Sequence, residues 1–278
     1  MKKISEFPSL LLSTICALGL MTCVVSAQVP DSLTNGLVAY YTFEGTINDA
    51  SGNGRDLAQT NDISFTADRF GNSDGAVMFN STASYARSAD LFGMSGNVQH
   101  TVSFWIQAPT IAPFGFGKIL SLGTYQGVAT DCFYEIDACQ VSTANTPGRI
   151  FCDSAYAGYD ALNLGTDFIQ HWNQIVFVYN GQFSTSQIYM NGTALPTTPN
   201  YYSSSDQLAL VDTVIAVGGN DIAFQGARIS DLGIWSTAFS ATDVTDLYNA
   251  QSVPEPSTYA LLLLSGAASI FAFKRRKS

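Results

Sequence analysis

Basic residues are scarce in this sequence, and the scarcity limits its possible partners. The 278 residues include 12 lysines and arginines against 22 aspartates and glutamates, a formal net charge of −10 at pH 7. Residues 28–252 hold six of the basic residues. They also hold 20 of the 22 acids, since only Glu6 and Glu255 lie outside this range, and so carry a charge near −14. Such an acidic surface repels phosphate backbones and anionic headgroups. This argues against nucleic acid as a partner and is compatible with divalent cations.

Histidine and cysteine are also few. The chain has two histidines and five cysteines, without a metal-type spacing among them, which argues against a zinc site. Three of the cysteines lie outside the N-terminal leader: Cys132, Cys139 and Cys152. The apolar runs at 133–141 and 149–154 predict a hairpin that places Cys139 near Cys152. We therefore expect these two to form a disulfide in an oxidising compartment.

The N-terminus has the three parts of a secretory signal peptide. Lys2 and Lys3 precede an apolar run at 10–25, and small residues end at Ala27. This pattern predicts cleavage by signal peptidase after Ala27 and export through the inner membrane. An uncleaved membrane anchor is the alternative.

At the C-terminus the order is reversed: the apolar segment comes first and the basic residues follow it. After Pro254-Glu255-Pro256 comes an uncharged stretch at 257–273, and residues 274–277 are all basic. Seventeen residues of helix span about 25 Å, enough for a short transmembrane helix with its basic end in the cytoplasm. The tail, residues 253–278, resembles the PEP-CTERM sorting signal of Gram-negative bacteria. The resemblance implies cleavage near Pro254, Glu255 and Pro256 by an exosortase, a membrane protease, and transient anchoring by the helix. The destination would be the cell surface or the extracellular matrix. A plain membrane anchor is the alternative.

The body of the chain reads as many short strands separated by polar turns, which predicts an all-β sandwich. Residues 101–107 alternate apolar and polar side chains, and 173–179 with 187–190 form a predicted hairpin. One helix is expected after Ser240, because Asp243 completes a capping box before an apolar face.

Some of these strands are apolar on both faces, as at 175–179. One face must pack the core, and the other is covered by loops or lines a binding surface. We expect Trp105 and Tyr189 on that second face as ligand-binding residues. Packing under a loop is the alternative for both.

Five blocks of sequence resemble the laminin-G-like, concanavalin A-like jelly rolls, in the order of that family. They are GLVAYYTFEGTINDASGNGRDL, DRFGNSDGAVMFNSTASYAR, HTVSFWIQA, HWNQIVFVYNG with IYMNGTAL, and GARISDLGIWSTAFSATDVTDLYNA. The resemblance implies two antiparallel sheets within residues 28–252, calcium at the rim, and binding of carbohydrate or protein. It also implies that the first block, residues 36–54, closes against residues 226–235.

The first block suggests where calcium would bind. Calcium takes six to eight oxygen ligands, and a glycine-rich turn after a strand supplies several. The side chains expected to contribute are Glu44, Asp49, Ser51 and Asn53, and the resemblance adds Asp231. A turn that bonds only its own backbone is the alternative.

We expect a secreted, non-catalytic binding module for polysaccharide or matrix components. A structural matrix protein without a sugar site is the first alternative. The second is a glycoside hydrolase, because residues 135–140 resemble the EIDxxE strand of laminarinases. In this chain Gln140 replaces the second glutamate, which removes the acid/base that a retaining mechanism needs.

Overall fold

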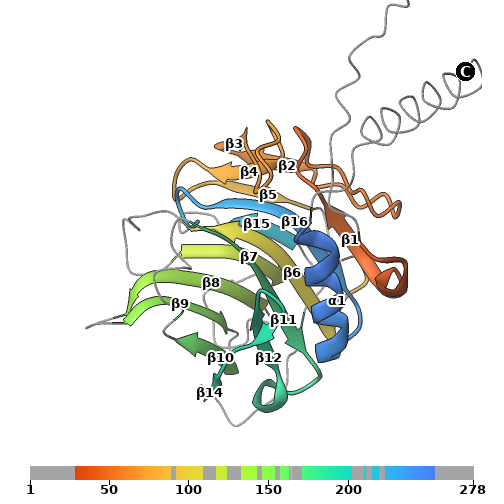
Figure 1. The fold of residues 1–278 in the computed structure, drawn as a ribbon, viewed down its shortest axis with the longest axis vertical. Helices are drawn as coiled ribbons and strands as arrows, with labels where there is room; N and C mark the ends of the chain where they lie inside the picture. The colour runs from red at the N-terminus through yellow and green to blue at the C-terminus, as the bar shows by residue number, and fades with distance from the viewer. Residues whose placement is uncertain are drawn as a thin grey trace, which may run out of the picture. The chain divides into compact units, whose positions relative to one another are not determined.

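The described part of the chain folds into two stacked antiparallel sheets with a helix on the outside, as a computed structural model shows (Figure 1). The structure describes residues 29–88, 92–108, 117–123, 133–142, 146–153, 157–162, 164, 171–201, 210, 215–218 and 223–253. The predicted signal peptide, transmembrane helix and sorting residues Pro254, Glu255 and Pro256 lie outside these ranges. No helix within them is long and apolar enough to cross a membrane.

The first sheet, sheet A, contains the strand around 175–179 that is apolar on both faces. Its order is β13-β12-β11-β6-β16-β4-β3, and β1 also pairs with β16. The strands of sheet A are β1 (Leu37–Tyr41), β3 (Ile63–Thr66), β4 (Ala76–Phe79), β6 (His100–Gln107), β11 (Trp172–Tyr179), β12 (Gln187–Met190), β13 (Thr193–Ala194) and β16 (Arg228–Trp235).

The second sheet, sheet B, has the order β14-β10-β9-β8-β7-β15-β5-β2. Its strands are β2 (Gln59–Asn61), β5 (Tyr85–Arg87), β7 (Gly117–Gly123), β8 (Phe133–Ser142), β9 (Thr146–Asp153), β10 (Ala157–Leu162), β14 (Thr197–Tyr201) and β15 (Ile215–Gly218). The two-sheet antiparallel sandwich expected from the sequence is thereby confirmed.

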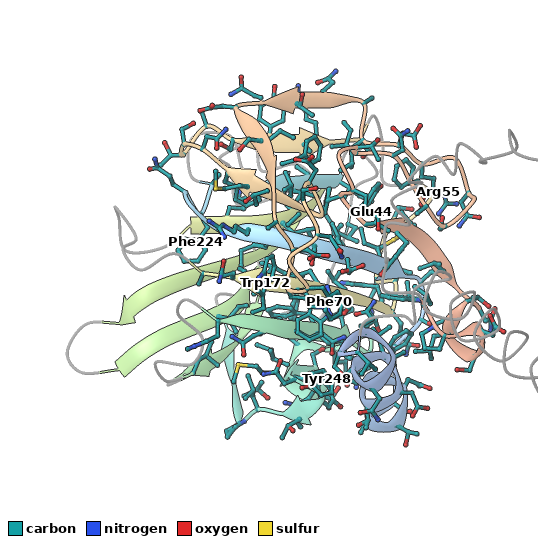
Figure 2. The ribbon with its side chains drawn as sticks, turned by 45° about the horizontal axis from the view of Figure 1, so that its top comes forward. Glu44, Arg55, Phe70, Trp172, Phe224 and Tyr248 are labelled. Atoms are coloured by element: carbon teal, nitrogen blue, oxygen red, sulfur yellow. The ribbon has the colours of Figure 1, made fainter. Side chains whose placement is uncertain are left out.

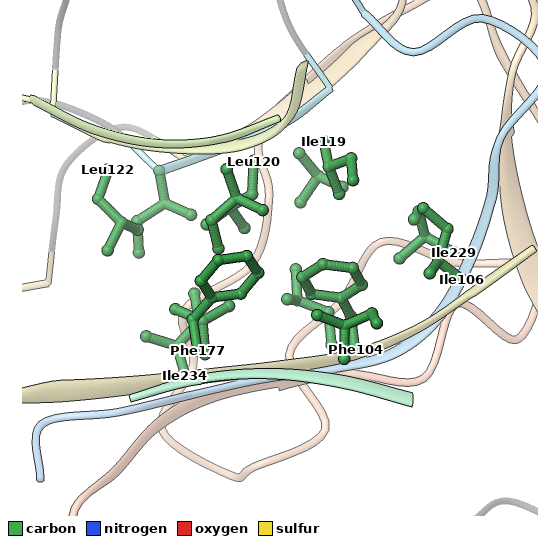
Figure 3. Packing of buried hydrophobic residues seen from close by; sticks show 14 of the residues in the cluster. Phe104, Ile106, Ile119, Leu120, Leu122, Phe177, Ile229 and Ile234 are labelled. Atoms are coloured by element: carbon green, nitrogen blue, oxygen red, sulfur yellow. The ribbon is translucent and has the colours of Figure 1, made fainter. Parts of the chain in front are cut away.

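The main core lies between the sheets. Figure 3 shows Phe104, Phe177 and Ile234 of sheet A facing Leu120 and Leu122 of sheet B. All five side chains are fully buried. Burying an apolar side chain of this size stabilises the fold by about 1.5–3 kcal/mol, so the interleaved faces hold the sheets together.

A second apolar cluster covers the outer face of sheet A. Helix α1 (Ala241–Gln251) lies across this face, where Val244 and Leu247 of the helix pack with Trp235 and Val176 of the sheet. Ser240 caps the helix with the predicted capping box to Asp243. The described residues also form the 3-10 turns η1 (Asp31–Leu33) and η3 (Phe183–Thr185).

Residues 36–54 do close against residues 226–235, as expected. Strand β1 pairs antiparallel with β16, and Tyr41 lies opposite Leu232 nearly two hundred residues along the chain. Strand β4 pairs with the first half of the same edge of β16. The closure is therefore a strand pairing that joins the N-terminal part of the domain to its last strand.

The predicted hairpin exists as β8 and β9, but its register is wrong for the predicted disulfide. Cys139 lies opposite Arg149, and Cys152 lies opposite Ile136. Three strand positions separate the two cysteines along the hairpin, about 10 Å at the rise of an antiparallel strand. A disulfide needs α-carbons within about 7 Å of each other, so the predicted bond between Cys139 and Cys152 does not fit this register.

Candidate functional site

Arg69 and Asp231 form a buried ion pair on the outer face of sheet A. Asp231 lies in a β-bulge of β16, and its φ of 50° is in the left-handed region that non-glycine residues rarely adopt. The side chains of Arg69 and Asp231 are 5% and 7% exposed, so water barely reaches the pair. A second bond runs from Arg69 Nη1 to Ser230 Oγ over 3.1 Å.

Aromatic rings enclose the Arg69 guanidinium. Its central carbon lies 4.3 Å from the ring centroids of both Phe70 and Trp105. Arg69 Nε and Nη2 both donate to the backbone carbonyl of Gln251, at 3.1 and 2.8 Å. This carbonyl ends helix α1, where the helix dipole favours a cation. Arg69 therefore links the bulge of β16 to the end of the helix.

The Gln251 side chain completes this buried set, which we name the Arg69–Asp231 cluster: Tyr40, Arg69, Trp105, Gln174, Asp231 and Gln251. Gln251 Oε1 accepts from Trp105 Nε1 at 3.0 Å and from Gln174 Nε2 at 2.9 Å. Its Nε2 donates to the Tyr40 hydroxyl, which in turn donates to Asp231 Oδ1 at 2.7 Å. Figure 2 shows Phe70 beside this region and Tyr248 on the helix below it.

Burial sets the protonation of this cluster. It raises the pKa of Tyr40 well above the usual value, and the neighbouring Asp231 carboxylate adds to the shift, so Tyr40 stays a neutral donor. Burial also raises the pKa of Asp231, while the Arg69 charge and the hydrogen bonds oppose that shift. The groups are closed to solvent and hydrogen-bonded to one another, apart from Gln174 Oε1, which is buried without a partner. This is the arrangement of a structural clamp.

The residues predicted as calcium ligands do not form one ligand set. Asp49 Oδ1 accepts from the backbone N–H groups of Tyr40 and Ser51, and Oδ2 accepts from Ser51 Oγ and the Arg55 N–H. Burial alone would raise the pKa of Asp49, but these hydrogen bonds lower it below its usual value. Both oxygens of the Asp49 carboxylate thus already accept hydrogen bonds from protein donors.

Asn53 and Asp231 have separate partners as well. The Asn53 amide donates to the carbonyls of Leu37 and Val38 on the free edge of β1, and Asp231 binds Arg69. Tyr40 contacts Asp49 through its backbone and Asp231 through its hydroxyl, at opposite ends of the residue. Among the described residues, groups of three or more metal-ligating His, Cys, Asp or Glu side chains are absent. Of the predicted ligands, Asp49, Asn53 and Asp231 therefore already have protein partners, and Asp231 is bound to Arg69 apart from the turn.

The loop at 48–55 instead caps the edge of β1. Ala50 N–H donates to the Tyr40 carbonyl, and Arg55 Nη1 donates to the Val38 carbonyl. Together with Asp49 and Asn53, these groups satisfy backbone atoms that an edge strand leaves open to other chains. The loop thus bonds the backbone of β1 as well as its own, whereas the alternative drawn from the sequence was a turn that bonds only its own backbone.

Chelation provides a direct test of the calcium prediction, which stays untested. We expect EDTA to leave the midpoint of urea unfolding of the purified protein unchanged, because Asp49 and Asp231 already have protein partners. Urea titrations with EDTA and with added calcium would measure the midpoint. A lower midpoint in EDTA that calcium restores and magnesium does not would contradict this expectation.

Trp105 and Tyr189, the predicted ligand-binding residues, are both covered. They lie on the outer face of sheet A, as expected, but are 5% and 8% exposed. Trp105 stacks on Tyr248 of the helix, with ring centroids 5.9 Å apart, and Tyr189 belongs to the apolar cluster under the helix. The prediction that they bind ligand is wrong for this face, because α1 occupies it. Their burial matches the alternative that they pack under a covering segment.

The outer face of sheet B carries a different set of side chains. Ala86, Val217 and Leu120 point into the core, so their neighbours Tyr85, Arg87 and Ser121 occupy the opposite face. The register places Arg87 opposite both Gln59 and Ala216, and Ser121 lies opposite Glu135.

Tyr85 and Arg87 form the best-defined polar and aromatic pair on this face. The Arg87 guanidinium lies 4.9 Å from the Tyr85 ring centroid, and its Nε donates to Gln59 Oε1 over 2.7 Å. Both side chains are half-buried, so each offers one open side. This pair was missed from the sequence; strand alternation at 85–87 was the signal that could have identified it.

Comparisons with solved structures agree with this architecture. The binding domain of botulinum neurotoxin serotype G is 18% identical, with a TM-score of 0.56, and the match covers 78% of this chain and 51% of that one. The binding domain of Paraclostridial Mosquitocidal Protein 1 is 17% identical, with a TM-score of 0.54, covering 78% and 52%.

A third structure is the botulinum neurotoxin serotype D ligand-binding domain in complex with N-acetylneuraminic acid. It is 16% identical, with a TM-score of 0.53, and the match covers 79% of this chain and 52% of that one. This chain thus spans about half the length of each of these three domains, and identities this low show the fold alone. The curated proteins include no match.

Two family models match the chain directly. The PEP-CTERM protein-sorting motif matches residues 252–277, which confirms the resemblance of the C-terminal tail and indicates export and exosortase-dependent sorting. The model described as the concanavalin A-like lectin/glucanases superfamily, of laminin-G type, matches residues 80–245, more than half of the chain. This protein therefore belongs to the concanavalin A-like lectin/glucanases superfamily and carries a PEP-CTERM sorting motif.

Proposed function

We propose that the protein is a secreted, surface-sorted and non-catalytic module that binds polysaccharide or another matrix component. The observation that carries this proposal is the difference between the two outer faces. Helix α1 closes the outer face of sheet A, whereas the outer face of sheet B presents Tyr85 and Arg87 half-open to solvent. A ligand would accordingly bind sheet B.

The chemistry of the pair suits a sugar. An aromatic ring offers an apolar face to the C–H groups of a pyranose, while arginine and glutamine donate hydrogen bonds to hydroxyl or carboxyl groups. Ala216, which lies opposite Arg87, has a small side chain, so the side chains of Tyr85 and Arg87 project beyond it. The serotype D neurotoxin ligand-binding domain, about half of which matches this chain, is in complex with a sugar, N-acetylneuraminic acid.

Catalysis has less support. Residues 135–140 lie on β8, with Glu135 and Asp137 on either side of the buried Ile136. Gln140 stands where the laminarinase pattern has its second glutamate. A non-catalytic module is therefore the function we propose, with exosortase and signal peptidase as its processing enzymes.

A glycan array with the purified mature protein tests the proposal. We expect saturable binding of at least one polysaccharide, and calorimetry on that glycan should show Tyr85→Ala to bind about tenfold more weakly, a loss of about 1.4 kcal/mol. Thr242→Ala, an exposed site on α1, is the matched control and should bind normally.

Two other results would count against the proposal. An array without any binding, with self-association in ultracentrifugation, would favour a structural matrix protein. Turnover of a β-glucan that Glu135→Gln abolishes would favour the hydrolase.

A further inference from the structure

Gln251 anchors the chain at the point where the folded domain ends. It is fully buried, and its backbone carbonyl and side-chain amide contact Arg69, Trp105, Gln174 and Tyr40. These four partners come from β1, β6, β11 and the segment before β4. The last residue of α1 is therefore held by parts of the chain that are far apart in sequence.

The sorting motif begins immediately after this anchor. The family match starts at residue 252, and Ser252 and Val253 alone separate Gln251 from Pro254. Val253 is 60% exposed, the one exposed large hydrophobic side chain among the described residues. The chain thus passes from fully buried to exposed within two residues, and the domain has almost no linker before its processing signal.

We propose that the Gln251 anchor couples folding of the domain to processing of the sorting signal. A protease needs extended backbone, and it cleaves where local burial and hydrogen bonding are low. Helical backbone up to Gln251 cannot be extended while the anchor holds. Each further residue of free chain spans at most about 3.6 Å, so two residues bring little backbone clear of the domain. Cleavage then depends on release of the last turn of α1.

Insertion of a spacer tests this coupling in the full-length precursor. We expect a flexible Gly-Ser spacer of about ten residues between Ser252 and Val253 to speed conversion of precursor to mature protein by about threefold or more. Gln251→Ala should change the rate in the same direction, because it removes the side-chain contacts to Trp105, Gln174 and Tyr40 and so weakens the hold on the last turn. Asn249→Ala, an exposed residue of the same turn, is the matched control and should leave the rate unchanged.

Pulse labelling of cells that express an exosortase would measure the precursor fraction over time, and intact mass would give the new C-terminus. An unchanged rate in the spacer variant would overturn the proposal. The spacer variant leaves every contact of the domain in place, so its processing rate tests the proposal even if Gln251→Ala unfolds the domain. The outcome is independent of polysaccharide binding, because sheet B is untouched.

Discussion

Arg69→Ala is expected to destabilise the domain by about 3–5 kcal/mol, because it leaves Asp231 buried without its cation. The substitution also removes both donors to the Gln251 carbonyl and the cation between the rings of Phe70 and Trp105. A loss of this size is a large share of the stability of an ordinary domain. Urea unfolding followed by circular dichroism would measure the free energy of unfolding.

Two further variants show whether the loss comes from the unpaired charge. Arg69→Met combined with Asp231→Leu removes both charges, and we expect it to be more stable than Arg69→Ala because a buried carboxylate no longer lacks a partner. Arg87→Ala is the matched control, since Arg87 stacks on Tyr85 at a half-exposed site, and it should cost about 1 kcal/mol or less. Equal losses for Arg69→Ala and Arg87→Ala would show that the pair contributes no more than a surface contact.

This ion pair gives Asp231 a partner that the sequence did not predict, while the calcium site to which Asp231 was assigned stays a prediction. The sequence places Asp231 in a family block that closes on the first strand, and that closure is confirmed. Arg69 lies 162 positions earlier than Asp231, and local sequence patterns do not reveal a pairing at that separation. The scarcity of basic residues was the available signal, because an arginine in the DRFG block of so acidic a chain calls for a carboxylate partner.

Local patterns predicted the elements well for a physical reason. Alternation of apolar side chains and the capping box at Ser240 depend only on neighbours in sequence, so strands β6, β11 and β12, the β8–β9 hairpin and helix α1 followed from them. Short or polar strands such as β2 and β13 did not. The hairpin register did not follow, because a shift along a strand leaves composition unchanged. Cys139 consequently lies opposite Arg149 instead of near Cys152.

Strands that are apolar on both faces leave open what covers the second face. From the sequence, Trp105 and Tyr189 were compatible both with a ligand surface and with a packed layer under a covering segment. Helix α1 decides between them, since Trp105 stacks on Tyr248 and donates to Gln251, both from the helix. One amphipathic helix therefore serves three roles: it buries the outer face of sheet A, ends at the Arg69–Asp231 cluster, and sets the start of the sorting motif.

Gly233→Ala is expected to cost about 3 kcal/mol, although its backbone is not in a left-handed conformation. A β-carbon at Gly233 would lie 2.3 Å from Trp235 Cη2 and 2.5 Å from Cζ3. The ring cannot move aside easily, because Trp235 is fully buried, packs 4.8 Å from the Phe239 ring, and donates from Nε1 to the Leu33 carbonyl at 2.7 Å. The absence of a side chain at Gly233 thus provides the space that the Trp235 ring occupies.

Gly52→Ala separates this steric effect from backbone strain. Gly52 has a φ of 85°, and an added β-carbon would meet nothing within 4 Å, so its cost should be the left-handed penalty of about 1–2 kcal/mol. Trp235→Phe should rescue Gly233→Ala in part, since the smaller ring leaves room for the methyl group. In urea unfolding, the double variant should therefore lose less free energy than the sum of the two single variants. Additive losses would show that the Trp235 ring does not set the cost at Gly233, and the close packing at the end of β16 would need another explanation.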